Sequence, residues 1–188
     1  SENNKMVWDD EKIKRWATNG GVRNFDEKLV NSASIDLRMS EFVARPITVA
    51  NGWCDPNQAI RYGDKAAMSN LWGEVHRFEE LVLYPGEPVL MASMEYITIP
   101  DDACGLLFSK STFGRCLVEH AHAGFFDPGF SGTGTFEFFH VGKRPIIFRP
   151  GDRVVQLVLL DMASVPSSLY GEVGRYQGQV LPTGPKGW

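Results

Sequence analysis

The sequence predicts a mainly β protein, folded as a distorted β-barrel or jelly roll with one short helix near its N-terminus. Short candidate strands follow one another at close spacing from Glu80 onward. Turn sequences such as Tyr84-Pro85-Gly86-Glu87 and Arg149-Pro150-Gly151-Asp152 separate them. Helical periodicity largely disappears after Gly21. Many short strands broken by Pro-Gly turns are typical of barrels and jelly rolls, and not of a doubly wound α/β sheet.

The N-terminal helix is predicted from a cap, an apolar face and a stop signal. Either residue of Asp9-Asp10 can cap it, and Ile13, Trp16 and Ala17 then share one face. Gly20-Gly21 supplies the residue type that most often ends a helix. We therefore expect one short helix before the strands begin.

The strands are predicted from alternation and turn chemistry. Ser34 to Arg38 alternates with period two, as a half-buried strand should. Residues 50 to 78 contain the turn pairs Asn51-Gly52 and Asp55-Pro56, which predict an irregular connection with one helical turn near Ala66 to Leu71. The later strands are predicted at Glu80 to Leu83, Val89 to Met94, Tyr96 to Ile99, Gly105 to Phe108, Thr133 to Phe139, Pro145 to Phe148 and Arg153 to Leu160.

Length and composition predict one domain followed by a tail. A chain of 188 residues with 43% hydrophobic and 22% charged residues is ordinary for one soluble globular domain. Residues 1–169 are predicted to form this domain. In residues 170–188, glycines alternate with polar residues and with Pro182 and Pro185. Such a tail has little to bury by itself and is predicted to be mobile until something orders it.

Charge and cysteine content limit the partners and the compartment. The formal net charge of −4 provides no basic field, so nucleic acid is not an expected partner. Cys54, Cys104 and Cys116 are widely spaced and form neither a disulfide framework nor a CxxC metal clip. The polar start resembles no signal peptide, and no apolar run approaches the roughly 20 residues of a membrane helix. We expect a protein of the reducing cytoplasm, with no membrane partner.

Glu137 is the leading candidate for proton transfer. In Thr135-Phe136-Glu137-Phe138-Phe139, alternation places it opposite Phe136 and Phe138 on the strand. The ordinary interpretation is a solvated carboxylate on an outer face. The functional interpretation is a carboxylate in a largely apolar site, held ionised by Arg115 and able to take a proton from water. Alternation alone does not decide between them.

Two segments before Glu137 carry residue types suited to a nucleotide. Ser109 to Thr112 is either a strand end with exposed hydroxyls or a loop whose N–H groups and Lys110 hold phosphate oxygens. Asp127-Pro128-Gly129-Phe130 has common turn chemistry. His120 and His122 lack the His-x-Glu and Pro-Cys-x-x-Cys elements of a zinc deaminase, so no zinc site is expected.

The order of several segments carries a family resemblance. The segments are SASIDLRMS, LVLYPGEPVLMASMEYITIPDDACGLLFSKSTFGR, HAHAGFFDPGFSGTGTFEF, RPIIFRPGDRVVQLVLL and YGEVGRYQGQVLP. In this order they resemble the dCTP deaminase branch of the trimeric dUTPase-like superfamily, almost end to end except for about residues 50 to 78. The resemblance implies a dUTPase-like barrel and a homotrimer in which three subunits share each active site. It also implies Mg²⁺ bound with the triphosphate.

The resemblance further implies roles for single residues. Glu137 matches the family's catalytic glutamate, Arg115 the arginine that pairs with it, and Ser111 the serine that helps orient the water. Ala123 matches the residue whose backbone carbonyl lies beside that water, and Asp127 the aspartate that hydrogen-bonds the deoxyribose 3′-hydroxyl. The other implied nucleotide contacts come from the phosphate loop, the last barrel strand and the tail. They are Lys110, Ser111, Thr112, Gln156, Tyr170, Arg175, Tyr176 and Gln179.

The implied reaction is hydrolytic deamination of dCTP to dUTP and ammonia. Glu137 would deprotonate a water that attacks C4 of cytosine, protonate N3 and pass a proton to the departing amine, with no metal at C4. Gly114, Ala123-Gly124 and DPGFSG look more like members that continue to dUMP and pyrophosphate. Two alternatives stay open: a dUTPase-type pyrophosphatase without deaminase activity, and a catalytically silent nucleotide-binding protein.

Departures from the family pattern concern the base and the phosphates. Lys110 replaces a usual Arg, which keeps the charge and loses bidentate phosphate contacts. His122 stands where the family commonly has Thr, beside the base and the water, and is our specificity candidate. A deaminase for a modified dCTP is therefore a third alternative. The sequence predicts neither dTTP feedback nor assembly beyond a trimer.

Overall fold

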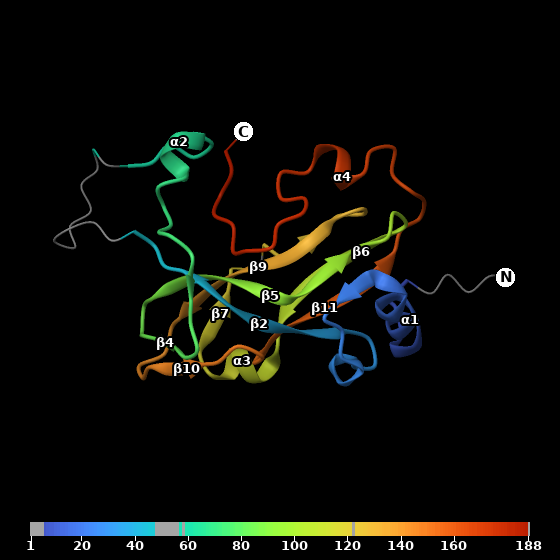
Figure 1. The fold of residues 1–188 in the computed structure, drawn as a ribbon, viewed down its shortest axis with the longest axis horizontal. Helices are drawn as coiled ribbons and strands as arrows, with labels where there is room; N and C mark the ends of the chain where they lie inside the picture. The colour runs from blue at the N-terminus through green and yellow to red at the C-terminus, as the bar shows by residue number, and fades with distance from the viewer. Residues whose placement is uncertain (1–5, 48–56, 58, 122, 188) are drawn as a thin grey trace.

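The chain folds mainly into β-strands around one core (Figure 1). The computed structural model describes residues 6–47, 57, 59–121 and 123–187. Its strands are β1 (Val22–Arg23), β2 (Ile35–Ala44), β3 (His76–Arg77), β4 (Leu81–Leu83), β5 (Pro88–Thr98), β6 (Ala103–Ser109), β7 (Val118–His120), β8 (Phe125–Phe126), β9 (Ser131–His140), β10 (Ile146–Phe148) and β11 (Arg153–Asp161). Its helices are α1 (Asp10–Trp16), α2 (Lys65–Met68), α3 (Ser111–Arg115) and α4 (Tyr170–Val173), with a π-turn at Ala17–Gly21 and a 3₁₀-turn at Glu27–Leu29.

Most strands belong to one curled antiparallel sheet. Its order is β7-β9-β5-β2-β11-β6-β8, with β1 added to β5 and β3 added to β2. Strands β4 and β10 form a separate two-stranded ladder. Among the residues that the structure describes, no ladder joins β7 to β8, so the sheet curls without closing. The mainly β prediction is confirmed, and the distorted barrel takes the form of a half-barrel.

The N-terminal helix is confirmed in its cap, its face and its end. The Asp9 carboxylate accepts a hydrogen bond from the backbone N–H of Lys12 at 2.9 Å. Ile13 and Ala17 are buried on the face that meets the sheet. Gly20 has φ +95°, a left-handed conformation that glycine adopts without steric cost, and there the helical path ends.

Two strand predictions are wrong in extent. The strand predicted at Ser34 to Arg38 continues to Ala44, and Ile35, Asp36 and Leu37 are all buried. Half-burial fails there because β2 lies between β5 and β11 inside the sheet, and its side chains are covered on both faces.

The two strands predicted at Val89 to Met94 and Tyr96 to Ile99 are one strand, β5. Its pairing with β9 shifts register between Ala92 and Tyr96, where a bulge keeps the chain within the same strand.

Very short elements were missed or only partly predicted. The helical turn expected near Ala66 to Leu71 is α2, and the Asp64 side chain caps it by accepting from the N–H of Ala67 at 3.0 Å. The turn pairs predicted at residues 51–52 and 55–56 lie outside the described residues. Strands β3, β7 and β8 and helix α3 were not predicted, because two to five residues show no measurable periodicity.

The tail packs back onto its own chain, beside the first half of β9 (Figure 1). The N–H of Gly178 donates to the Ser131 carbonyl at 2.7 Å, and the N–H of Thr133 donates to the Gln179 carbonyl at 2.8 Å. Pro182 is buried. The tail therefore buries more than its composition suggested, because its backbone completes the open edge of a strand.

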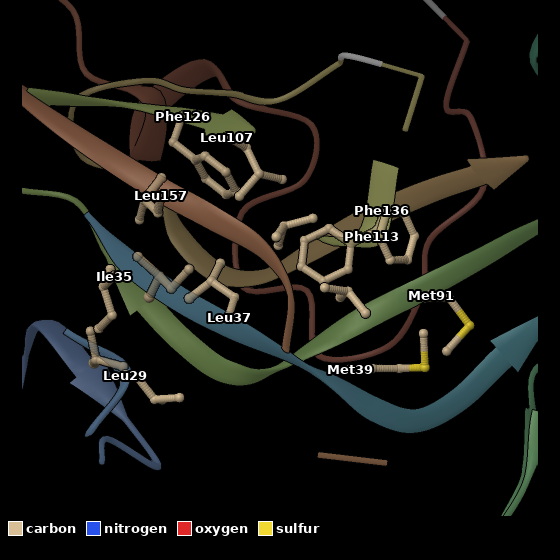
Figure 2. Packing of buried hydrophobic residues seen from close by; sticks show 14 of the residues in the cluster. Leu29, Ile35, Leu37, Met39, Met91, Leu107, Phe113, Phe126, Phe136 and Leu157 are labelled. Carbon is tan, nitrogen blue, oxygen red and sulfur yellow. The ribbon is translucent and has the colours of Figure 1, made fainter. Parts of the chain in front are cut away.

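The core fills the concave side of the sheet (Figure 2). Leu37 and Met39 from β2, Met91 from β5 and Phe136 from β9 are all fully buried. Phe113 from α3 packs on Phe138 with ring centroids 4.6 Å apart. These contacts fix β9 between a filled face and a face that remains available for a site.

One ion pair lies inside this scaffold. The Glu95 carboxylate is fully buried and accepts hydrogen bonds from Nε of Arg38 at 2.6 Å and from the Arg38 backbone N–H at 2.8 Å. Burial raises the pKa of Glu95, and the Arg38 contacts act in the opposite direction. The pair joins β2 to the bulge of β5.

Replacement of Arg38 should reveal how much the unpaired, buried carboxylate of Glu95 destabilises the fold. We expect Arg38→Ala to lower the free energy of unfolding at neutral pH by about 3 kcal/mol, because an unpaired buried carboxylate remains. The loss should shrink as the pH falls toward about 4.3, since protonated Glu95 needs no cation. Denaturant unfolding at several pH values measures both. Arg77→Ala, which breaks an exposed pair with Glu41, is the control and should change little; equal losses for both variants would contradict the assignment.

Candidate active site

Glu137 lies on the face of β9 that the core does not use. Phe136 and Phe138 are 0% and 1% exposed and point into the core, as the alternation predicted. Glu137 points to the other face, where it lines a cavity of about 340 Å³. Its side chain is 29% exposed. The solvated-surface interpretation is therefore wrong for this carboxylate, which sits in a recess.

The environment of Glu137 disfavours its charged form. Burial raises the pKa of the carboxyl, and a hydrogen bond with its own backbone only partly offsets this. Atom Oε2 is buried and accepts no hydrogen bond from the described residues. Nε2 of His120 lies 3.6 Å from it. A carboxyl whose pKa is raised by burial binds a proton more readily than an exposed one, which suits a group that transfers protons.

His120 is a site residue that the sequence analysis considered only as a zinc ligand. Its side chain is fully buried at the end of β7, edge-on to Phe136 at 6.3 Å and to Phe138 at 5.8 Å. Its position was not predictable from spacing, because β7 is too short to show alternation. The ladder between β7 and β9 brings the imidazole to Glu137.

Asp127 stands where two cavities meet. Pro128 and Gly129 form a turn in which the N–H of Phe130 donates to the Asp127 carbonyl at 3.1 Å, and Gly129 has φ +81°. This confirms the predicted turn, of the kind that needs glycine in its third position. Asp127 borders both the cavity of Glu137 and a neighbouring cavity of about 530 Å³.

The tail supplies further walls to both cavities. The Tyr170 hydroxyl accepts from the N–H of Tyr176 at 3.1 Å, and both rings line both cavities. Gln179 donates through Nε2 to the Thr133 carbonyl at 2.7 Å, and no described residue hydrogen-bonds its buried Oε1. Arg175 lines the second cavity. Ala123 completes the first cavity beside Glu137.

The remaining predicted residues form a second cluster, around α3. Ser111, Thr112 and Arg115 are exposed on α3. Lys110 donates through Nζ to both carboxylate oxygens of the buried Asp36 at 2.7 Å.

Gln156 belongs to the same cluster. It lies on β11, and its Oε1 accepts from the Ser34 hydroxyl at 3.4 Å. The group of cations and hydroxyls that the sequence pattern places before Arg115 thus exists in the folded chain, with Lys110 already paired.

A single chain does not bring the two clusters together. Helix α3 lies on the side of β9 opposite the tail (Figure 1). Its Phe113 packs on Phe138, which points to the core face, away from Glu137. The ion pair expected between Arg115 and Glu137 is therefore not formed within one chain, and the only described partner of Glu137 at ion-pair distance is His120. The expected site residues of α3, Ser111, Thr112 and Arg115, do not line the cavity of Glu137.

Three further observations concern metals, the membrane and the specificity candidate. In the described ranges, no three His, Cys, Asp or Glu side chains are grouped so that they could hold a metal ion. The same ranges contain no helix long and apolar enough to span a membrane. His122 lies outside the described residues, so its predicted role stays a prediction.

Comparison with known proteins identifies the family. A family model described as dCTP deaminase-like matches residues 7–162. The chain is 40% identical to "dCTP deaminase, dUMP-forming" of Mycolicibacterium vanbaalenii over 95% of this chain and 94% of that one. It is 39% identical to the protein of that name from Mycolicibacterium gilvum over 89% and 87%.

A solved structure shows the same fold. The 2'-deoxycytidine 5'-triphosphate deaminase from Agrobacterium tumefaciens superposes with a TM-score of 0.67 at 18% identity. The match covers 85% of this chain and spans half the length of that one. At this identity the likeness bears on the fold alone.

The raised pKa of Glu137 should appear as a pH dependence of stability. A carboxyl whose folded-state pKa lies above its unfolded value of about 4.3 stabilises the fold below that value, and loses this contribution as the pH rises through the folded pKa. Wild-type protein should therefore lose stability relative to Glu137→Gln over this pH window. Urea unfolding of both proteins from pH 4 to 8 measures the difference, and parallel curves would refute it.

Proposed function

The chain belongs to the dCTP deaminase-like family, and from this premise we propose that it deaminates dCTP and hydrolyses the resulting dUTP to dUMP and pyrophosphate. The observation that carries the proposal is Glu137, a recessed carboxyl with a raised pKa in a cavity that it shares with Asp127 and the tail. The name of these relatives, which includes "dUMP-forming", supports the second step.

Glu137 is the proton carrier at cytosine C4 in this proposal. It takes a proton from a water that attacks C4 and delivers this proton to N3. It then takes the proton of the new C4 hydroxyl and gives it to the amine, so that the C4 carbonyl forms, the C4–N bond breaks and ammonia leaves. Burial raises the pKa of Glu137 above the ordinary value of a carboxyl, which makes it a stronger base, as a group that must take a proton from water requires. The carbonyl of Ala123 and the hydroxyl of Ser111 are the proposed groups that orient the water.

The two cavities divide the nucleotide between them. The smaller cavity, with Glu137 at its wall and a volume of about 340 Å³, is the proposed place of the base. Asp127, at the junction, would accept a hydrogen bond from the deoxyribose 3′-hydroxyl. The larger cavity, with Arg175 and Tyr176 at its wall, would receive the phosphates, and the tail would act as their lid.

Magnesium is proposed to enter with the triphosphate. The absence of an acidic cluster among the described residues fits an ion held mainly by phosphate oxygens and water, which is common for Mg²⁺. Its chemistry would be to neutralise phosphate charge. The free thiols of Cys104 and Cys116 support a reducing compartment, and we place the protein in the cytoplasm.

Assembly would complete the site. The cavity contains Glu137 and the tail, whereas Ser111, Thr112 and Arg115 are exposed on the opposite side of β9. In a closed homotrimer, α3 of one subunit would reach the cavity of the next and supply these hydroxyls and the cation. Lys110 would add charge for the phosphates, and Gln156 would support them from β11.

Product analysis tests the proposed reaction. We expect the protein with Mg²⁺ and dCTP to release ammonia and to yield dUMP and pyrophosphate. Glu137→Gln keeps the shape and removes the base, so ammonia release should fall by about 10² or more. Separation of the nucleotides by chromatography distinguishes the alternatives: dUTP as end product means deamination alone, and turnover of dUTP but not of dCTP means a pyrophosphatase. No turnover of either, or normal ammonia release by the variant, would refute the proposal.

Subunit mixing tests the shared site. Arg115→Ala and Glu137→Gln subunits should each be inactive alone. Random trimers of the two should recover about one quarter of the wild-type rate, because some interfaces join an intact Glu137 to an intact Arg115. Co-expression with two affinity tags and an ammonia assay measures the recovery. Mixed trimers that stay inactive would mean that each site is built within one chain.

A further inference from the structure

One wall of the cavity comes from a residue that lies outside the sequence segments to which site roles were assigned. Trp72 lies between α2 and β3, within residues 50 to 78. Its half-buried side chain lines the same cavity as Glu137 and as Leu90 of β5. Leu90 pairs with Glu137 across the β5–β9 ladder. An indole in this position stands close to the proposed catalytic carboxyl without any assigned role.

The backbone of Trp72 is fixed to the sheet. Trp72 forms a β-bridge with Pro46, just beyond the end of β2. The N–H of the next residue, Gly73, donates to the Arg45 carbonyl at 2.9 Å. Main-chain hydrogen bonds therefore hold Trp72 at the end of β2, a central strand. The tail that it meets is bonded to the edge of β9.

The end of the tail, residues 183–187, lies against Trp72 and α2. A Cβ atom built on Gly184 would lie 3.4 Å from Cδ1 of the indole. A Cβ built on Gly187 would lie 2.6 Å from the Gly63 carbonyl oxygen and 2.7 Å from the backbone of Lys65. Figure 1 shows the C-terminal end beside α2. A Cβ at position 184 would be in ordinary van der Waals contact with the indole, whereas the close approach at Gly187 leaves no room for a side chain.

The tail end also meets the rest of the site. The Thr183 N–H donates to the Thr135 hydroxyl at 3.4 Å, two residues before Glu137 on the same face of β9. The Lys186 N–H donates to the Tyr176 hydroxyl at 3.0 Å, and its ammonium group donates to the Arg175 carbonyl at 2.6 Å. Whatever holds residues 183–187 therefore also holds the walls of both cavities.

We propose that Trp72 is a positioning residue of the site: with the start of α2 it forms a latch that seats residues 183–187 and keeps the tail closed over the cavity of Glu137. The indole lies beside Gly184 and lines the cavity, so its loss enlarges the cavity and removes a contact of the tail end together. The latch depends only on contacts within the folded chain and not on the activity of the protein. Its effect on substrate rests on the proposed function.

Hydrogen exchange tests the latch without any substrate. In Trp72→Ala, the amides of residues 177–187 should exchange about 10-fold faster than in the wild type, because the tail opens locally. Gly187→Val should give the same increase from the other side of the contact, since its Cβ would overlap the backbone of Gly63 and Lys65. Leu71→Ala, which removes an exposed neighbouring side chain outside the cavity, is the matched control and should leave exchange unchanged.

The fold is monitored in the same experiment through the amides of β5 and β11, which should keep wild-type protection. Trp72→Phe should restore most of the protection of the tail, because an aromatic ring still fills the space. Unchanged exchange of residues 177–187 in Trp72→Ala, or an equal increase in Leu71→Ala, would overturn the latch.

Kinetics then separates positioning from chemistry. Trp72→Ala should raise the KM for dCTP about 10-fold with a smaller change in kcat, because the closed tail contributes binding to ground state and transition state alike. An equal fall in kcat with unchanged KM would refute positioning. If the wild-type protein does not turn over dCTP, the proposed function fails, whereas the exchange result still decides the latch.

Discussion

Strand β9 has to serve two environments at once, since its pleat sends successive side chains to opposite faces. Phe136 and Phe138 complete a closely packed core, and a shift of one residue would put both of them in the cavity and Glu137 among apolar side chains. The register that the core enforces through β5 therefore also sets the position of the carboxyl. The β5–β9 ladder thus sets both the packing of the core and the position of the carboxyl.

The open edge of β9 has a second consequence. Strand β7 pairs only with the last residues of β9. On that edge, the backbone groups of Ser131 and Thr133 therefore have no partner in β7. The tail satisfies them through Gly178 and Gln179, and this pairing places tail side chains over the cavity. An exposed strand edge is normally a liability for aggregation, and here it serves as the seat of a covering segment.

How far the sequence predicts this protein depends on the length of its signals. The mainly β class, the helix that Asp9 caps and the turn after Asp127 rest on several residues each, and the structure confirms them. His120 and Trp72 could not be found in this way, because His120 lies on a strand too short to show a period and Trp72 lies between two short elements. Tertiary packing alone brings both to the cavity of Glu137. The separation of Arg115 from Glu137 within one chain could not be read from local patterns either, since it depends on which face of β9 the helix α3 packs against.

That separation bears directly on the charge of Glu137. Within one chain the carboxyl is partly desolvated, no Lys or Arg of the described residues lies at ion-pair distance, and burial raises its pKa. The approach of Arg115 from another subunit would favour the ionised form, because an opposite charge at close range lowers the pKa of a carboxyl. The general base would then become fully competent only in the assembled protein. In this arrangement, Arg115 sets the protonation state on which the proposed reaction depends, and oligomerisation becomes part of the catalytic apparatus.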